Sequence, residues 1–294
     1  MRTLFGKREM HAAHPEQRRK HVAAFAGGLA LMLLQGAAMA GIFTTRHNLS
    51  SSGSFNKFDG TAEICVFCHT PHGANSAITA PLWNRNLSTA AYASYASLGT
   101  SSLDGQTIAT GSVSIACLSC HDGSQAMNIM VNTPGSGTTG TLAGNWSGSG
   151  QFGVGTLAST FTYIGTDLTN DHPVGIQYAG GGIAFSTPTP IITNDPYFAQ
   201  ASGNGTPLAR SGSVIGQVGT KITGSGKTVW WVETNGVSGQ QQDDLSLYTR
   251  TDATLTDPQP FVECASCHDP HSSNTTFLRI SNNSSALCLT CHVK

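Results

Sequence analysis

Residues 264–271 read Cys-Ala-Ser-Cys-His-Asp-Pro-His, and residues 65–72 read Cys-Val-Phe-Cys-His-Thr-Pro-His. Both stretches contain the pattern Cys-x-x-Cys-His, which occurs twice more, at residues 117–121 and 288–292. The four copies account for all 8 cysteines of the 294-residue chain. One pattern therefore explains the complete cysteine content of the sequence.

Three chemistries compete for cysteine pairs of this kind. An even cysteine count in an exported chain favours disulfides, and paired Cys-x-x-Cys units favour tetrahedral zinc. Neither explains why a histidine follows every pair. Covalent attachment of c-type haem does, because two cysteines three residues apart lie on one side of a helical turn and the next histidine binds the iron. The sequence therefore predicts four covalently attached c-type haems.

Each motif contributes two cysteines and one histidine to the predicted haem sites. The cysteines expected to form the thioethers are Cys65, Cys68, Cys117, Cys120, Cys264, Cys267, Cys288 and Cys291. The histidines expected to bind iron on the proximal side are His69, His121, His268 and His292.

The remaining histidines match the number of irons. Of the 11 histidines, three lie in the first 40 residues and four are proximal, which leaves His47, His72, His172 and His271. A lone histidine is otherwise a surface or hydrogen-bonding residue. Methionine, the other common sixth ligand, occurs after residue 40 only as Met127 and Met130. The count favours the four spare histidines as distal ligands, with bis-histidine ligation at every haem.

Two prolines constrain the spare histidines. His72 and His271 each lie three residues after a proximal histidine, and Pro71 and Pro270 fix the backbone between them. A side chain so close to one proximal ligand reaches a neighbouring haem more easily than the opposite face of its own. We therefore expect His72 at the haem of the second motif and His271 at that of the fourth. His172 would then serve an N-terminal haem.

Saturated ligation has a consequence for function. Six-coordinate iron offers no vacant position to a substrate, so the count argues for electron transfer rather than enzymatic chemistry, and we expect no catalytic residue. The alternative from a different class is a multihaem reductase with one five-coordinate haem.

The first 40 residues are typical of an export signal. Six Lys or Arg residues precede an apolar run from residue 22 to residue 34, which is too short to span a bilayer. Ala38, Met39 and Ala40 supply the small residues of a cleavage site. We predict a signal peptide over residues 1–40 and no membrane span in the mature chain. Its removal leaves 9 Lys or Arg against 14 Asp or Glu, which excludes a nucleic-acid partner.

The motifs divide the mature chain into three segments. Two motifs lie in residues 41–123 and two in residues 263–294, while the insert 124–262 is rich in Gly, Ser and Thr. Its clearest strand signal is Thr228–Val232, with weaker ones at 174–178 and 183–185, and a helical pattern covers 285–292. The predicted fold is a multihaem cytochrome c that is mostly irregular, with short helices at the motifs and a small β-rich insert.

Several stretches resemble a known family of extracellular tetrahaem cytochromes. They are residues 46–48, 81–85 and 171–175 together with the motif regions 65–73, 117–123, 262–271 and 286–294. Together they resemble the OmcE-type cytochromes of metal-reducing bacteria, which polymerise into filaments, the so-called nanowires. The resemblance covers well under half of the chain, and most of the insert lies outside it. It implies a continuous series of closely spaced haems running through head-to-tail subunits.

The resemblance also implies partners and a location. The protein would be an extracellular or cell-surface homopolymer that receives electrons from periplasmic or outer-membrane cytochromes and passes them to acceptors such as metal oxides. A histidine near one terminus that binds a haem of the next subunit makes a heterologous contact, and an open filament results. We expect His47 in this cross-subunit position. The runner-up is a monomeric periplasmic tetrahaem carrier.

Overall fold

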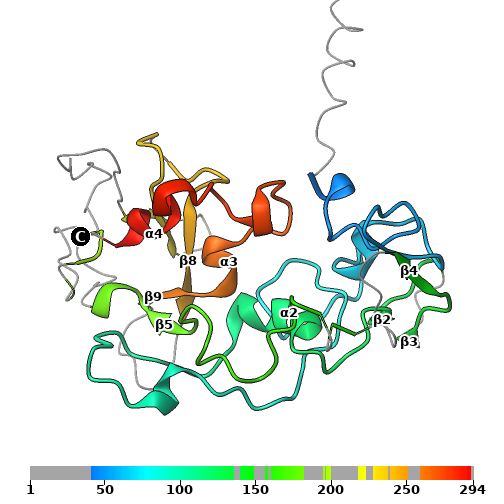
Figure 1. Ribbon diagram of the computed structural model, residues 1–294, viewed down its shortest axis with the longest axis horizontal. Helices are drawn as coiled ribbons and strands as arrows, with labels where there is room; N and C mark the ends of the chain where they lie inside the picture. The colour runs from blue at the N-terminus through cyan, green and yellow to red at the C-terminus, as the bar shows by residue number, and fades with distance from the viewer. Residues whose placement is uncertain are drawn as a thin grey trace, which may run out of the picture. The chain divides into compact units, whose positions relative to one another are not determined.

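The computed structural model describes residues 41–135, 140–148, 156–157, 160–181, 195, 197–199, 218–222, 228–237, 239–250 and 259–292. For residues 218–222 and 228–229 it describes the backbone only. The chain divides into two units, Met1–Ala40 and Gly41–Lys294, and all described residues belong to the second (Figure 1). The predicted signal peptide and the weak strand signal at 183–185 lie outside the described residues.

Short helices carry the four motifs. The α-helices are α2 (Ser112–His121), α3 (Cys264–Cys267) and α4 (Ala286–Cys291). The 3-10 turns are η2 (Gly41–Thr44), η3 (Cys65–Phe67), η4 (Tyr95–Leu98), η5 (Tyr178–Gly180), η6 (Thr275–Phe277) and η7 (Asn283–Ser285). The first motif starts in η3, and the other three lie in or end α2, α3 and α4. Short helices at the motifs are therefore confirmed, and α4 falls inside the predicted 285–292.

Small antiparallel sheets form the rest of the regular structure. Strand β1 (Asn56–Phe58) pairs with β4 (Trp146–Gly148), and β2 (Ile129–Met130) pairs with β3 (Gly140–Thr141). A five-stranded sheet has the order β5-β9-β8-β7-β6. Its strands are β5 (Ile176–Gln177), β6 (Val218–Ile222), β7 (Thr228–Val232), β8 (Leu245–Arg250) and β9 (Gln259–Val262). Strand β7 has the predicted bounds, and β2 to β9 all lie in the insert.

The five-stranded sheet positions the third and fourth motifs. Strand β9 runs directly into α3, and α3 also lies beside β8 (Figure 1). Strand β5 pairs with β9, with Ile176 opposite Val262. The core of this region contains the fully buried side chains of Trp230 and Val232, and Cys291 of the fourth motif packs against it. The insert is therefore part of the framework around the C-terminal motifs.

A second apolar cluster lies around the first two motifs. Phe58, Phe67 and Met130 are at most 1% exposed, and Cys68 and Cys120 pack against this cluster. Met127, in the same cluster, is 3% exposed. Both methionines considered as possible iron ligands are thus core residues between the first and second motifs.

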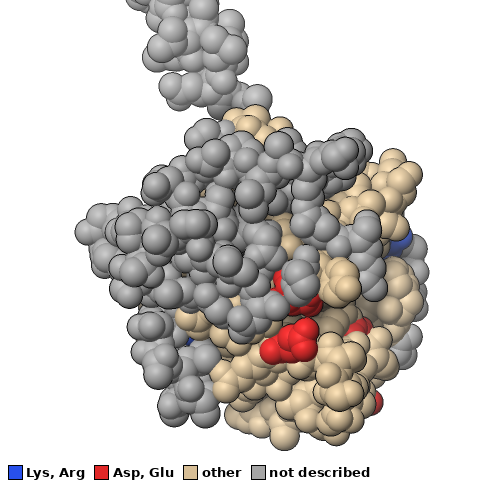
Figure 2. All heavy atoms as spheres, turned by 90° about the vertical axis from the view of Figure 1, so that its left-hand side faces the viewer, with Lys and Arg blue, Asp and Glu red and all other residues tan. Residues whose placement is uncertain are grey.

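Uncharged side chains dominate the surface. Figure 2 shows a few Asp and Glu side chains on an otherwise mostly uncharged described face, in keeping with the 11% of charged residues. In the described part of the chain, no helix has the length and apolar character needed to cross a membrane.

Candidate haem-binding site

Each motif adopts one helical turn. The backbone N–H groups of His69, His268 and His292 donate to the carbonyl oxygens four residues earlier, at 2.8, 3.1 and 2.8 Å. In the second motif the same turn is the end of α2, whose last residue is His121. The turn places the two cysteines of a motif on one side with the histidine next to them, which is the arrangement that double thioether attachment requires.

Several motif cysteines lie in apolar surroundings, whereas Cys65 and Cys288 are exposed. All eight are described, and none is in a disulfide. Burial raises the pKa of Cys68 to about 12, that of Cys267 to about 11, and that of Cys291 further. An environment that disfavours a thiolate fits a thioether sulfur, because a thioether carries no charge.

The Nδ1 atoms of three proximal histidines contact main-chain carbonyl oxygens. His69 Nδ1 lies 2.8 Å from Pro81 O, His121 Nδ1 lies 3.0 Å from Thr162 O, and His268 Nδ1 lies 2.8 Å from Thr276 O. A carbonyl can only accept a hydrogen bond, so each Nδ1 is the protonated nitrogen. The Nε2 lone pair is then left for a metal, which is the usual arrangement of an iron-binding imidazole.

Two spare histidines lie next to proximal ones. The ring centroids of His69 and His271 are 6.1 Å apart, with 14° between the ring planes, and those of His121 and His47 are 6.3 Å apart, with 73° between the planes. A metal–imidazole bond is about 2 Å long, and a ring nitrogen lies about 1 Å from its centroid. Two imidazoles on opposite sides of one iron therefore have centroids about 6 Å apart. Both pairs have the separation that fits bis-histidine ligation of a haem iron.

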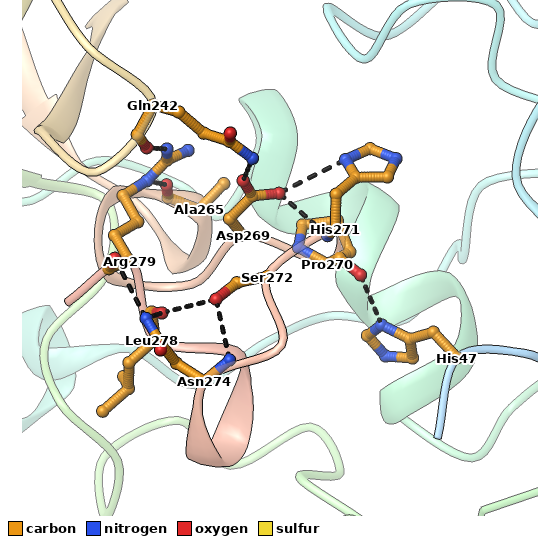
Figure 3. Close-up of polar contacts among 10 residues, drawn as sticks. All are labelled: His47, Gln242, Ala265, Asp269, Pro270, His271, Ser272, Asn274, Leu278 and Arg279. Atoms are coloured by element: carbon orange, nitrogen blue, oxygen red, sulfur yellow. Dashed lines mark hydrogen bonds and ion pairs between the residues drawn. The ribbon is translucent and has the colours of Figure 1, made fainter. Parts of the chain in front are cut away.

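The surroundings of His47 keep its imidazole neutral. Its ring stacks on Phe277 at 4.0 Å with 13° between the planes. Its Nδ1 lies 3.4 Å from Pro270 O, as Figure 3 shows by a dashed line. Burial, followed by the proximity of His121, lowers the pKa of His47 to about 4. A neutral imidazole at physiological pH is the form that binds a metal.

This arrangement differs from the sequence-based pairing. His271 lies beside His69 of the first motif instead of at the fourth motif, and His47 lies beside His121 of its own chain. The course of the backbone after α3 explains both positions. It brings the carbonyl oxygen of Pro270 next to the ring of His47, and the next residue, His271, then lies beside His69. His72 and His172 are exposed, and neither has a ring contact with a motif histidine in the described part of the chain.

Motifs that are neighbours in the sequence are also close in space. Cys120 is close enough to Cys68 to contribute, after burial, to its raised pKa. Helix α2 of the second motif packs beside α3 of the third, and Cys288 of the fourth motif contributes in the same way to the raised pKa of Cys267 in the third. We call this series, from the first motif to the fourth, the motif row.

A buried polar network joins the second and third motifs. Glu263, whose side chain is 0% exposed, accepts from Ser114 Oγ at 2.5 Å and forms an ion pair with Arg250 at 2.6 Å. The Cys264 N–H donates to Ser114 Oγ at 3.0 Å. The Cys117 and Cys264 sulfurs also lie close to each other. Sequence analysis did not identify this network, because its members are far apart along the chain.

Asn84 and Arg85 are two further structural residues that sequence analysis did not assign. The Asn84 side chain donates to Val66 O at 2.7 Å, and its N–H donates to Cys68 O at 2.9 Å. Arg85 is completely buried and donates to carbonyl oxygens at the end of α2 and in the turn after it. Both lie in the stretch 81–85 that carries part of the family resemblance, so that stretch has a structural role around the first two motifs.

Comparison with known families agrees with this chemistry. Residues 259–294, which hold the third and fourth motifs, match the family model described as "Doubled CXXCH motif". No curated protein matches the chain in a sequence comparison. Together with the geometry above, the CXXCH motifs indicate covalently bound c-type haem and a multihaem c-type cytochrome.

Proposed function

We propose that the protein is an exported tetrahaem c-type cytochrome that carries electrons through bis-histidine haems. The observation that carries the proposal is the separation of two histidine pairs, 6.1 Å for His69 and His271 and 6.3 Å for His121 and His47. Bound haem supplies one-electron redox chemistry, and two imidazoles per iron leave no position for a substrate. Electron transfer is the function that such a site performs.

The proposal assigns a role to every motif residue. The eight motif cysteines hold the four haems, and the four motif histidines are the proximal ligands. His271 is the distal ligand at the first motif and His47 at the second. His72 and His172 then remain as the candidate distal ligands at the third and fourth motifs.

The motif row supports a conduit rather than four separate redox centres. Neighbouring motifs share a core cluster, a helix contact or close cysteines. Electron transfer between haems depends on such proximity, so electrons can pass from each site to the next along the row.

The finer proposal is a head-to-tail extracellular filament for extracellular electron transfer. Its support is the resemblance of the motif regions to filament-forming cytochromes and the low charge of the chain, 11%. Such a filament would accept electrons from periplasmic or outer-membrane cytochromes and deliver them to acceptors such as metal oxides. The competing form is a monomeric periplasmic carrier.

Carbon monoxide binding tests the ligation. We expect the spectrum of the reduced, haem-loaded protein to be unchanged by the gas, while His47→Ala and His271→Ala each open one iron and bind it. Phe277→Leu, which removes only the ring stacked on His47, serves as the control, and carbon monoxide should not change its spectrum. Mass spectrometry should show four haems in every variant. A spectral shift in the unmodified protein would favour the reductase. If carbon monoxide changed the spectrum of neither histidine variant, the assigned pairs would be contradicted.

A further inference from the structure

His271 differs from the other paired histidines in the group that its Nδ1 contacts. His271 Nδ1 lies 3.2 Å from Asp269 Oδ1 (Figure 3). The Nδ1 atoms of His47, His69 and His121 instead contact main-chain carbonyl oxygens. One of the four rings in the two histidine pairs therefore has an anionic partner, and three have a neutral one.

Asp269 is held in place by several other groups. It is 7% exposed. Its Oδ1 accepts a hydrogen bond from the main-chain N–H of His271 at 2.9 Å, and its Oδ2 accepts one from Gln242 Nε2 at 3.0 Å. Its own N–H donates to Phe277 O at 2.8 Å. An aspartate side chain is a carboxylate at neutral pH, and the contacts above hold it against the His271 ring.

The nearby cation is committed to other acceptors. Arg279 lies near enough to Asp269 to interact with it electrostatically. Its guanidinium, however, donates to Ala265 O at 3.0 Å and to Gln242 O at 2.7 Å (Figure 3). The carboxylate therefore keeps its contact with the imidazole.

The first motif shows that this position does not require a carboxylate. Thr70 follows His69 as Asp269 follows His268, and its Oγ1 donates to His72 O at 3.0 Å. A threonine thus supports the same His-x-Pro-His turn by a main-chain hydrogen bond. The charge at position 269 is an additional feature of the third motif.

We propose that Asp269 is a positioning residue that lowers the reduction potential of the haem at Cys65 and Cys68 through its contact with His271. This inference rests on the proposed ligation of that haem by His271. A carboxylate that accepts the Nδ1 hydrogen makes the imidazole a more basic ligand. A more basic and more negative ligand environment stabilises the ferric over the ferrous iron, which lowers the potential.

A low potential at this position has a consequence for direction. Of the two assigned pairs, only that of the first motif has a carboxylate contact, and electrons move spontaneously toward sites of higher potential. The contact would therefore favour electron flow from the first motif toward the second.

Potentiometric titration of Asp269→Asn tests the proposal. The amide oxygen of asparagine can accept both hydrogen bonds from His271 without the charge, and only the bond from Gln242 Nε2 is lost. Ligation should therefore persist, and one of the four midpoints should rise. We expect at least a tenfold change in the equilibrium of that haem, which is 59 mV for one electron. Asp269→Thr, which copies the first motif, should raise the same midpoint. The control is Asp167→Asn, which removes an exposed carboxylate bonded to Thr169.

The low-spin ferric electron paramagnetic resonance spectrum separates the outcomes. Unchanged midpoints with all low-spin signals retained would overturn the tuning role, as would an equal shift in the control. Loss of a low-spin signal in both Asp269 variants would show that Asp269 is needed for the ligation itself. That result would also overturn the tuning role. Failure of the underlying ligation is seen independently, because His271→Ala would then not bind carbon monoxide.

Discussion

Arg85 is a completely buried cation whose partners are mostly main-chain oxygens. Its Nη1 donates to Met127 O at 2.7 Å and to Ile129 O at 3.2 Å, and its Nη2 donates to Ser119 O at 3.0 Å and to Ala126 O at 3.1 Å. These oxygens lie in the last turn of α2 and in the segment after it. One side chain therefore fixes the position of the second motif relative to the core around the first.

We expect Arg85→Met to destabilise the protein strongly. Methionine fills part of the volume but leaves buried carbonyl oxygens without donors, at a cost of about 1–3 kcal/mol for each oxygen that finds no new partner. The expected loss in the free energy of unfolding is about 3 kcal/mol, measured by denaturant unfolding of the haem-loaded protein. Arg46→Met is the matched control, because exposed Arg46 lies over the Phe55 ring at 4.4 Å, a contact worth about 0.5–1 kcal/mol. Equal losses in the two variants would contradict the role of Arg85.

At the scale of elements, Glu263 links α2, α3 and β8. It precedes α3, where its side chain caps the helix, and it contacts Ser114 of α2 and Arg250 of β8. Burial raises the pKa of Glu263 above its ordinary value of 4.5, against the opposing effects of Ser114 and Arg250. The folded state therefore binds a proton at Glu263 more readily than the unfolded state does.

The sign of the resulting pH dependence follows from linkage. A group whose pKa is raised on folding contributes stability that is present below its unfolded pKa and is lost as the pH rises through its folded pKa. We expect the free energy of unfolding to fall more steeply above pH 4.5 in the unmodified protein than in Glu263→Gln. Denaturant unfolding at a series of pH values compares the slopes, and Glu63→Gln, at an exposed glutamate, is the control. Parallel curves for all three proteins would refute the prediction.

Local pattern predicted some elements and could not predict others. Strand β7 has the bounds expected from its β-branched and aromatic residues, because that signal lies within five residues. The Glu263 network gave no signal, because its partners Arg250 and Ser114 lie 13 and 149 positions away. Pairing of β5 with β9 also joins distant segments. Contacts of this kind depend on the path of the whole chain.

At the scale of the whole molecule, the number of spare histidines can be read from the sequence, whereas their pairing with motif histidines depends on the fold. The number of spare histidines could be obtained from the sequence, since it needs only a residue count. The position of His47 could not, because it depends on Pro270, 223 positions away along the chain. A histidine near the predicted mature N-terminus suggests a ligand for another subunit, whereas in the structure it contacts residues of its own chain.

The internal position of His47 changes what a filament would require. Its ring is stacked on Phe277 and lies 6.3 Å from His121, so under the proposed ligation this residue would serve its own chain. The exposed His72 and His172, proposed above as distal ligands at the third and fourth motifs, are then the histidines available to bind such a haem in a neighbouring subunit. We expect electron microscopy and sedimentation to show filaments of the unmodified secreted protein and of His47→Ala, and shorter or no filaments of His72→Ala or His172→Ala. Filaments lost in His47→Ala alone would place that residue across the subunit boundary after all, and a monomeric unmodified protein would favour the periplasmic carrier.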